Sequence, residues 1–321
     1  MRDEFRHVNE GFLIKLLRAQ EHLDSLEGEV TTFLNGSPYR VIRDAKPERT
    51  QYRVEVSQEI PAYVAAIAGD FLQNARSALD HFAWRLAGNK ADRDTSFPIY
   101  AKREGYFAKD RSGKFAPNSG AFKVATYFPD KAQAVIETMQ PYHGHEFGLS
   151  LLRLHDLARF DRHRLLHLLG GASDDFHLRA GRGRNERGEL IVLPGDPGAR
   201  MTMDVRLGTF EHNTELATFT HPSDVEVECD FAFYVAMREP DEGTFFPILP
   251  GFAGMLLATK DALVALAPFL PPHVKPTWAD VPALHVDLAD RLVQPVRPGG
   301  PYSVRIAKAG PRRPRLPPSR G

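Results

Sequence analysis

Acidic, basic and histidine side chains gather along residues 62–86, a segment that contains no proline. At about 100° per residue, its apolar residues fall on one face of a helix and its polar residues on the other side. The polar set includes Asp70, Asn74, Arg76, Asp80 and His81. A guanidinium binds phosphate through two parallel hydrogen bonds and histidine titrates near neutral pH. We therefore expect Asn74, Arg76, Asp80 and His81 to be catalytic residues in phosphate chemistry.

Arg76 and His81 form an Arg-x4-His pair, and Arg162 and His167 form another. These pairs resemble the motif of the HEPN (higher eukaryotes and prokaryotes nucleotide-binding) superfamily. In that family an arginine and a histidine on one helix form a metal-independent ribonuclease site, commonly across a dimer. The resemblance implies that Arg76 stabilises the phosphorane and that His81 transfers protons. Five positions place the two side chains about 140° apart on a helix, so only the length of Arg76 lets both reach one phosphate.

A further helix is expected from about residue 148 to residue 169, ended by two glycines. Positions 156, 159, 163 and 167 stand at offsets of 0, 3, 7 and 11 and therefore share one side of that helix. We expect this side to bind substrate through Arg159, Arg162, His163 and His167.

Two other uses of these polar sides stay open. A divalent metal would be held by Asp156, His163 and His167, completed by Asp70 or His81, and would indicate a metal-dependent hydrolase. No HExxH motif and no cysteine ligand accompany these residues, so we favour no metal and expect no cofactor.

The structural alternative is a non-enzymatic protein in which the polar sides form interhelical salt bridges. The residues available for such bridges are Asp70, Arg76, Asp80, Arg159, Asp161 and Arg162. This alternative predicts that acid on one helix opposes base on the other, with no cavity between them.

Three stretches also resemble a group of uncharacterised bacterial proteins. They are residues 69–81 (GDFLQNARSALDH), 139–144 (MQPYHG) and 154–164 (LHDLARFDRHR). The resemblance implies that both polar helices and the Gln-Pro-Tyr turn belong to one unit, and it implies no activity.

Composition limits the partners. The chain has 41 basic and 41 acidic residues and a formal net charge of zero, so contact with RNA, the expected ligand, must be local. The four arginines in residues 177–187 are either a phosphate-contacting loop or an exposed hairpin turn. No apolar run approaches a membrane span, and the one cysteine, Cys229, cannot close an intramolecular disulfide. We expect a cytoplasmic protein with no membrane partner and a homodimer as the oligomer.

The order of elements predicts an α+β fold. We expect helices over residues 5–26, 62–86, 130–139 and 148–169, with a hairpin at 39–43 and 51–56 and a short strand at 96–100. Strands follow at 190–193, 201–207, 215–220 and 225–237, then one helix at 254–269. Residues 1–171 thus form a helical domain with a small β insertion, and residues 172–310 a mainly antiparallel β domain with one helix. Residues 311–321 are expected to be a disordered basic tail.

Overall fold

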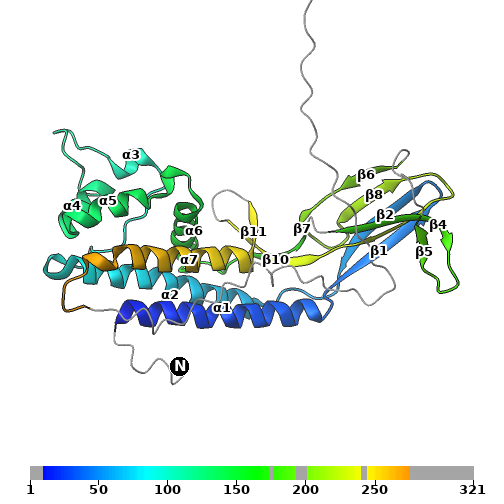
Figure 1. Ribbon diagram of the computed structural model, residues 1–321, viewed down its shortest axis with the longest axis horizontal. Coiled ribbons are helices and arrows are strands. Elements are labelled where there is room, and N and C mark those ends of the chain that lie inside the picture. Colours follow the sequence, from blue (N-terminus) through cyan, green and yellow to red (C-terminus); the bar gives the residue numbers. More distant parts are fainter. Residues whose placement is uncertain (1–9, 174–175, 193–200, 240–243, 275–321) are drawn as a thin grey trace, which may run out of the picture.

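The computed structural model describes residues 10–173, 176–192, 201–239 and 244–274. Helices gather at one end of an elongated molecule and strands at the other (Figure 1). Helices precede and follow the main run of antiparallel strands along the chain, which confirms the expected α+β class. The expected start of the first helix near residue 5 and the basic tail over 311–321 lie outside the described residues.

Four long helices pack together at the helical end. They are α1 (Gly11–Asn35), α2 (Ala62–Ala87), α6 (Glu146–Asp161) and α7 (Ile248–Leu266). On α2, apolar residues recur every three or four positions, and these are its buried side chains. Aromatic rings join the helices: the rings of Phe12 and Phe82 are edge-on with centroids 5.0 Å apart, and those of Phe71 and Phe252 are 4.7 Å apart.

α7 is the most apolar of these helices. By length and composition the stretch Ile248–Phe269 is sufficient to cross a membrane, with a mean hydropathy of 1.4, but half of it is buried. It packs against α1, α2 and α6. Its apolar composition is therefore explained by its place in the core. The helix begins at Ile248, earlier than the expected residue 254, because Pro250 lies in its first turn, where proline removes no helical hydrogen bond.

The hairpin expected after the first helix is present as β1 (Tyr39–Lys46) and β2 (Arg49–Val56). The two strands pair antiparallel along their whole length. β2 also pairs with β8 (Glu215–Thr220), and β8 pairs with β6 (Thr202–Val205). This sheet, in the order β1-β2-β8-β6, therefore joins residues that are more than 150 positions apart.

Two further antiparallel sheets complete the strand end, in the orders β11-β10-β3-β7 and β5-β4-β9. Their strands are β3 (Leu168–Ala172), β4 (His177–Arg184), β5 (Leu190–Val192), β7 (Gly208–Phe210), β9 (Glu226–Asp230), β10 (Phe233–Arg238) and β11 (Phe245–Pro247). The single strand expected at 225–237 is two strands, because β9 pairs with β4 whereas β10 pairs with β3.

Short elements connect α2 to α6. They are η2 (Gly88–Lys90), α3 (Arg103–Tyr106), α4 (Gly120–Tyr127), α5 (Asp130–Thr138) and η3 (Pro141–His143). α5 confirms the helix expected at 130–139. The strand expected at 96–100 does not form, since side chains hold the backbone there instead. Asp80 Oδ1 accepts from Phe97 N at 3.0 Å, and Gln140 Oε1 accepts from Tyr100 N at 3.0 Å.

The helix expected over 148–169 is wrong at its C-terminal end, since α6 ends at Asp161. Residues 168–172 form β3 between β10 and β7. Glycine lets this strand lie close to aromatic rings, because a Cβ at Gly170 would lie 2.7 Å from the ring of Phe210. Non-local sheet pairing therefore overrides the helical spacing of the apolar residues in this segment.

Candidate functional site

The candidate site lies where α2 and α6 approach each other most closely. Gly69 of α2 allows the approach, because a Cβ there would collide with the Asp161 carboxylate. Gln73, one turn further along α2, donates from Nε2 to Ala158 O at 2.8 Å and to Asp161 Oδ2 at 3.1 Å. The two helices thus run in opposite directions, and positions further along α2 meet positions earlier in α6. One more turn along α2 therefore places Arg76 at the level of His155.

Arg76 is buried between the two helices, with 7% of its surface exposed. Its Nη2 donates to Asp80 Oδ1 and to the carbonyl oxygen of Phe97, both at 2.8 Å. Its Nη1 is buried and has no hydrogen-bond partner. Burial lowers the pKa of this guanidinium, the carboxylate of Asp80 opposes that shift, and the charge of Arg162 adds to it. An unpaired donor on a buried cation is costly, so a hydrogen-bond acceptor placed at this nitrogen would stabilise the site.

His155 of α6 lies among three arginines. Burial and the charges of Arg76, Arg159 and Arg162 lower its pKa from 6.5 to about 4, so the imidazole is neutral at pH 7. Arg159 follows His155 by four residues and Arg162 by seven, which puts all three on one side of the C-terminal half of α6. Arg76, His155, Arg159 and Arg162 are called the α2–α6 arginine cluster below.

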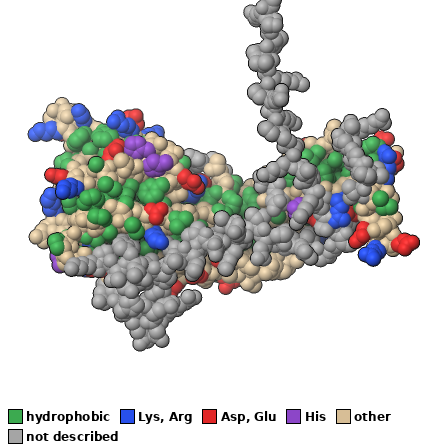
Figure 2. Space-filling model, viewed as in Figure 1, with side chains coloured by type: hydrophobic (Ala, Val, Ile, Leu, Met, Phe, Trp, Pro, Cys, Tyr) green, Lys and Arg blue, Asp and Glu red, His purple; other side chains and the backbone are tan. Residues whose placement is uncertain are grey.

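The cluster has little compensating negative charge. Arg159 and Arg162 are exposed, and neither has an ion-pair partner within the part of the chain that the structure describes. Arg76 pairs with Asp80 inside α2, and no ion pair between described residues joins α2 to α6. The interhelical bridges of the structural alternative are therefore not formed among residues 62–87 and 146–161. Charges of both signs are interspersed over the face in Figure 2, so an excess of one sign such as this cluster is local.

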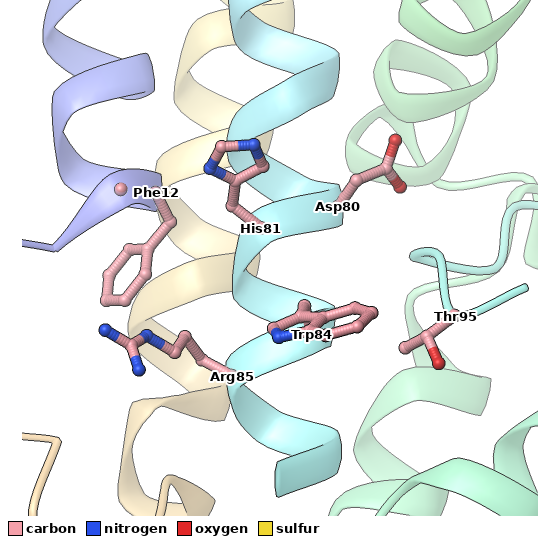
Figure 3. Close-up of a pocket in the computed structure, with 7 residues that line it drawn as sticks. Phe12, Asp80, His81, Trp84, Arg85 and Thr95 are labelled. Atoms are coloured by element: carbon pink, nitrogen blue, oxygen red, sulfur yellow. The ribbon is translucent and has the colours of Figure 1, made fainter. Parts of the chain in front are cut away.

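A second feature lies next to the cluster, along α2 between the start of α1 and the loop that carries Thr95. It is a pocket of about 450 Å³ lined by Gly11, Phe12, Asp80, His81, Trp84, Arg85 and Thr95. Figure 3 shows Phe12, His81 and Arg85 toward α1, and Asp80 and Thr95 toward the opposite side of α2. Arg85 Nε donates to Glu10 Oε2 at 3.0 Å, which fixes one wall. Asp80 belongs to both features, because it lines the pocket and holds Arg76.

The expected catalytic residues divide between these two features. His81 packs against α1, where a Cβ on Gly11 would lie 2.9 Å from its Nδ1, whereas Arg76 points to Phe97 and α6. Asn74 donates from Nδ2 to Asp70 O at 2.8 Å and accepts from Lys15 Nζ at 3.3 Å. Arg76 and Asp80 are brought together, while His81 and Asn74 face α1.

The metal alternative requires a helix that extends further than α6 does. His163 follows the end of α6 in a turn, and His167 immediately precedes β3, so neither lies on a helical face with Asp156. Asp70 is on the α1 side of α2, where its charge raises the pKa of His22 against the larger effect of burial. Among the described residues no three His, Cys, Asp or Glu side chains form a group that could hold a metal ion. We therefore withdraw the metal set.

Two of the four arginines of the segment 177–187 are engaged with carboxylates. Arg182 Nε lies 2.7 Å from Asp224 Oδ2, and Arg184 Nη2 lies 2.8 Å from both Glu226 Oε2 and Glu228 Oε1. These contacts join β4 to β9 and to the turn before it, so they explain two of the arginines as cross-strand pairs. In the α2–α6 arginine cluster, Arg159 and Arg162 lack such pairing among the described residues.

His155 is absent from the residues predicted from the sequence, although a signal is present. Residues 155, 159 and 162 follow the i, i+4, i+7 spacing of one helical face, and the prediction includes Arg159 and Arg162 but has the neighbouring Asp156 in place of His155. Trp84 and Thr95 are also absent from it, because the spacing of polar residues does not indicate an exposed tryptophan or a contact from a loop. No protein-family model, curated protein or solved structure matches this chain.

Proposed function

We propose that the protein binds a phosphate-bearing ligand, with RNA as that ligand, at the α2–α6 arginine cluster. The observation that carries the proposal is the buried, unpartnered Nη1 of Arg76 beside two arginines that lack carboxylate partners among the described residues. Phosphate oxygens carry negative charge and only accept hydrogen bonds, so they are suited to three guanidinium groups. The carboxylate of Asp80 is already paired with Arg76. Arg159 and Arg162 are exposed and supply the entrance, while Arg76 supplies the buried contact.

RNA is favoured over a free anion because the exposed arginines stand one turn apart along α6 and offer contacts to successive phosphates. Because the net charge is zero, we expect the RNA to be bound through a small number of phosphate contacts and not by a broad positively charged surface.

Binding of a fluorescently labelled single-stranded RNA, followed by anisotropy, tests the proposal. The double variant Arg159→Ala, Arg162→Ala removes two exposed side chains and leaves the core intact. We expect it to weaken binding by about tenfold or more, since charge-assisted contacts contribute roughly 1.5–3 kcal/mol each. Arg93→Ala is the matched control, because the Arg93 side chain is 93% exposed and lies outside the cluster. Equal affinities of the double variant and the control would refute the proposal.

Metal-independent cleavage of that RNA is a second candidate, and the position of His155 among Arg76, Arg159 and Arg162 favours it. An uncharged imidazole nitrogen can accept the proton of a ribose 2′-hydroxyl. The 2′-oxygen then attacks the adjacent phosphorus while the 5′-oxygen leaves with a proton taken from water, the His155 imidazolium returns its proton to the resulting hydroxide, and the arginines stabilise the charge of the phosphorane. Cleavage that persists in EDTA, stops with 2′-deoxy substrate and is lost in His155→Gln supports this candidate. Loss in His81→Gln with activity retained in His155→Gln assigns the proton transfer to the Arg-x4-His pair instead.

A further inference from the structure

The pocket beside the cluster has the size and the lining of a site for a flat aromatic ligand. Its volume of about 450 Å³ is within the range of small-molecule sites. Trp84 lines it with 49% of its surface exposed, and Thr95 closes the opposite side. An exposed indole offers a π-face, and aromatic side chains bind nucleobases by stacking. Trp84 follows Asp80 by four residues, so a ring stacked on the indole would have its edge near the Asp80 carboxylate.

Asp80 presents hydrogen-bond acceptors to this pocket in a fixed orientation. Its Oδ1 accepts from Arg76 Nη2 and from Phe97 N, and these two bonds hold the carboxylate in place. Its Oδ2 receives no hydrogen bond from another described residue. The neighbouring His81 ring has no hydrogen-bond partner in the same part of the chain. The pocket therefore contains donors, the His81 ring and the Arg85 guanidinium that Glu10 holds, and beside Trp84 a carboxylate oxygen that can only accept.

This chemistry discriminates between the nucleobases. Guanine presents two adjacent donors, N1–H and the 2-amino group, and the two lone pairs of Asp80 Oδ2 can accept from them while Oδ1 stays engaged with Arg76 and Phe97. Adenine and cytosine place a ring acceptor beside their amino group, and that acceptor would face the negative charge. Uracil has one N–H donor between two carbonyl oxygens. Only guanine offers paired donors on one edge.

We infer that the pocket lined by Asp80, His81 and Trp84 binds a guanine base. The inference deepens the proposed function and rests on it, because the Arg76–Asp80 pair puts this base pocket directly beside the α2–α6 arginine cluster. A guanine nucleotide of an RNA strand would then stack on Trp84 while a neighbouring phosphate contacts the arginines.

Tryptophan fluorescence gives a direct test with guanosine, which carries no phosphate. The chain has two tryptophans, and Trp278→Phe leaves Trp84 as the single reporter. We expect guanosine to quench this emission with saturation. We expect inosine, which lacks the 2-amino group, to bind about tenfold more weakly through the loss of one charge-assisted hydrogen bond. Adenosine and cytidine should bind more weakly still. Equal quenching by all four nucleosides, or no saturable quenching by guanosine, would overturn the inference.

Variants test whether Asp80 contacts guanosine, and they separate binding at the pocket from binding at the α2–α6 arginine cluster. In the same background Asp80→Asn should weaken guanosine at least tenfold, whereas Asp94→Asn, a nearby acid whose side chain is 71% exposed, should not. The nucleoside comparison needs no change at Asp80, so it remains decisive if Asp80→Asn fails to fold. Arg159→Ala with Arg162→Ala should leave guanosine affinity unchanged. Guanosine binding without RNA binding would therefore refute the cluster alone, and RNA binding without guanosine preference would refute the pocket alone.

Discussion

Asp80 and Arg76, four residues apart on α2, are joined by a 2.8 Å hydrogen bond between Oδ1 and Nη2. The same oxygen accepts the backbone N–H of Phe97, and Arg76 donates to the Phe97 carbonyl. One backbone residue from the connection after α2 is thus held at both its N–H and its C=O by a single ion pair. This arrangement fixes the floor of the site and links the arginine cluster to the pocket.

Loss of the Asp80 carboxylate should destabilise the protein. Asp80→Ala leaves the buried guanidinium of Arg76 without its counter-charge and the N–H of Phe97 without an acceptor. We expect a loss of roughly 2–4 kcal/mol in the free energy of unfolding, below the full value for a wholly buried pair because Asp80 is 31% exposed. Urea unfolding measures this loss. Adding Arg76→Met should recover part of it, and a double variant no more stable than Asp80→Ala would contradict the explanation.

The pH dependence of stability should report the environment of His155. Its pKa is about 4 in the folded protein and near 6.5 in the unfolded chain, so between these values the unfolded state binds more protons. The free energy of unfolding should therefore fall as the pH is lowered from 6.5 toward 4, while the full contribution is present above pH 6.5.

His155→Gln isolates this contribution from that of the carboxylates. The groups that face the imidazole are Arg76 from α2 and Arg159 and Arg162 from α6, and all stay charged across the window. Compared at about pH 4.5, 5.5, 6.5 and 7.5, the unfolding midpoint of the wild type should fall relative to that of the variant as the pH is lowered below 6.5. Parallel curves would show that His155 titrates normally.

The close approach of α2 and α6 makes Gly69 intolerant of a side chain. Gly69→Ala would push its Cβ into the Asp161 carboxylate, which would have to rotate away and lose its hydrogen bond from Gln73, so we expect a net cost of about 1 kcal/mol. Gly28→Ala is the matched control, because Gly28 is a helical glycine of α1 where an added Cβ would have no neighbouring atom within 4 Å. The control should gain about 0.5–1 kcal/mol from helix propensity. Similar effects at both positions in thermal or urea unfolding would contradict the tight α2–α6 contact.

Local spacing predicted the long amphipathic elements well. The helix expected over 62–86 is α2 at Ala62–Ala87, and the strand expected at 215–220 is β8. In both elements the spacing of the apolar residues matches the face that is buried in the structure. The segment after Asp161 has apolar residues at helical spacing and still becomes β3, because its partners β7 and β10 lie about 40 and 65 residues further along the chain. Such pairing leaves no local signal.

The candidate site could be predicted only in part, because contacts between residues far apart in the sequence also decide where its side chains point. The types and spacing of Arg76 and Asp80 marked them as candidates, and they are bonded to each other. What decides the direction of Arg76 is the backbone of Phe97, 21 residues later, together with the packing of α6. His81, five residues from Arg76, therefore faces α1 and not the arginine. A helical wheel gives the angle between two side chains but not the neighbour that each one meets.

His145 should stabilise the N-terminus of α6 as a capping residue. Its Nδ1 accepts from Gly148 N at 2.9 Å, and its Nε2 lies 2.8 Å from Thr138 O, so the neutral tautomer with hydrogen on Nε2 satisfies both contacts. His145→Ala should cost about 1 kcal/mol, the usual value for an N-cap, whereas His145→Asn should retain most of it. Among the described residues, the nearby His143 ring hydrogen-bonds only to Glu137, so His143→Ala is the control. Equal stability of the alanine variants at 143 and 145 in urea unfolding would contradict the capping role.

Salt dependence should count the phosphate contacts of the arginine cluster. For single-stranded RNA, the slope of log K against log salt is about −0.7 for each phosphate neutralised, so three arginines predict a slope near −2. Arg159→Ala with Arg162→Ala should reduce the magnitude of that slope by about 1.4, because two exposed contacts are lost. Affinity measured between about 50 and 200 mM salt, the range where such slopes are resolved, checks this. A slope unchanged in the double variant would mean that the phosphates contact other residues, since removing a cation that neutralises a phosphate must reduce the number of counterions released.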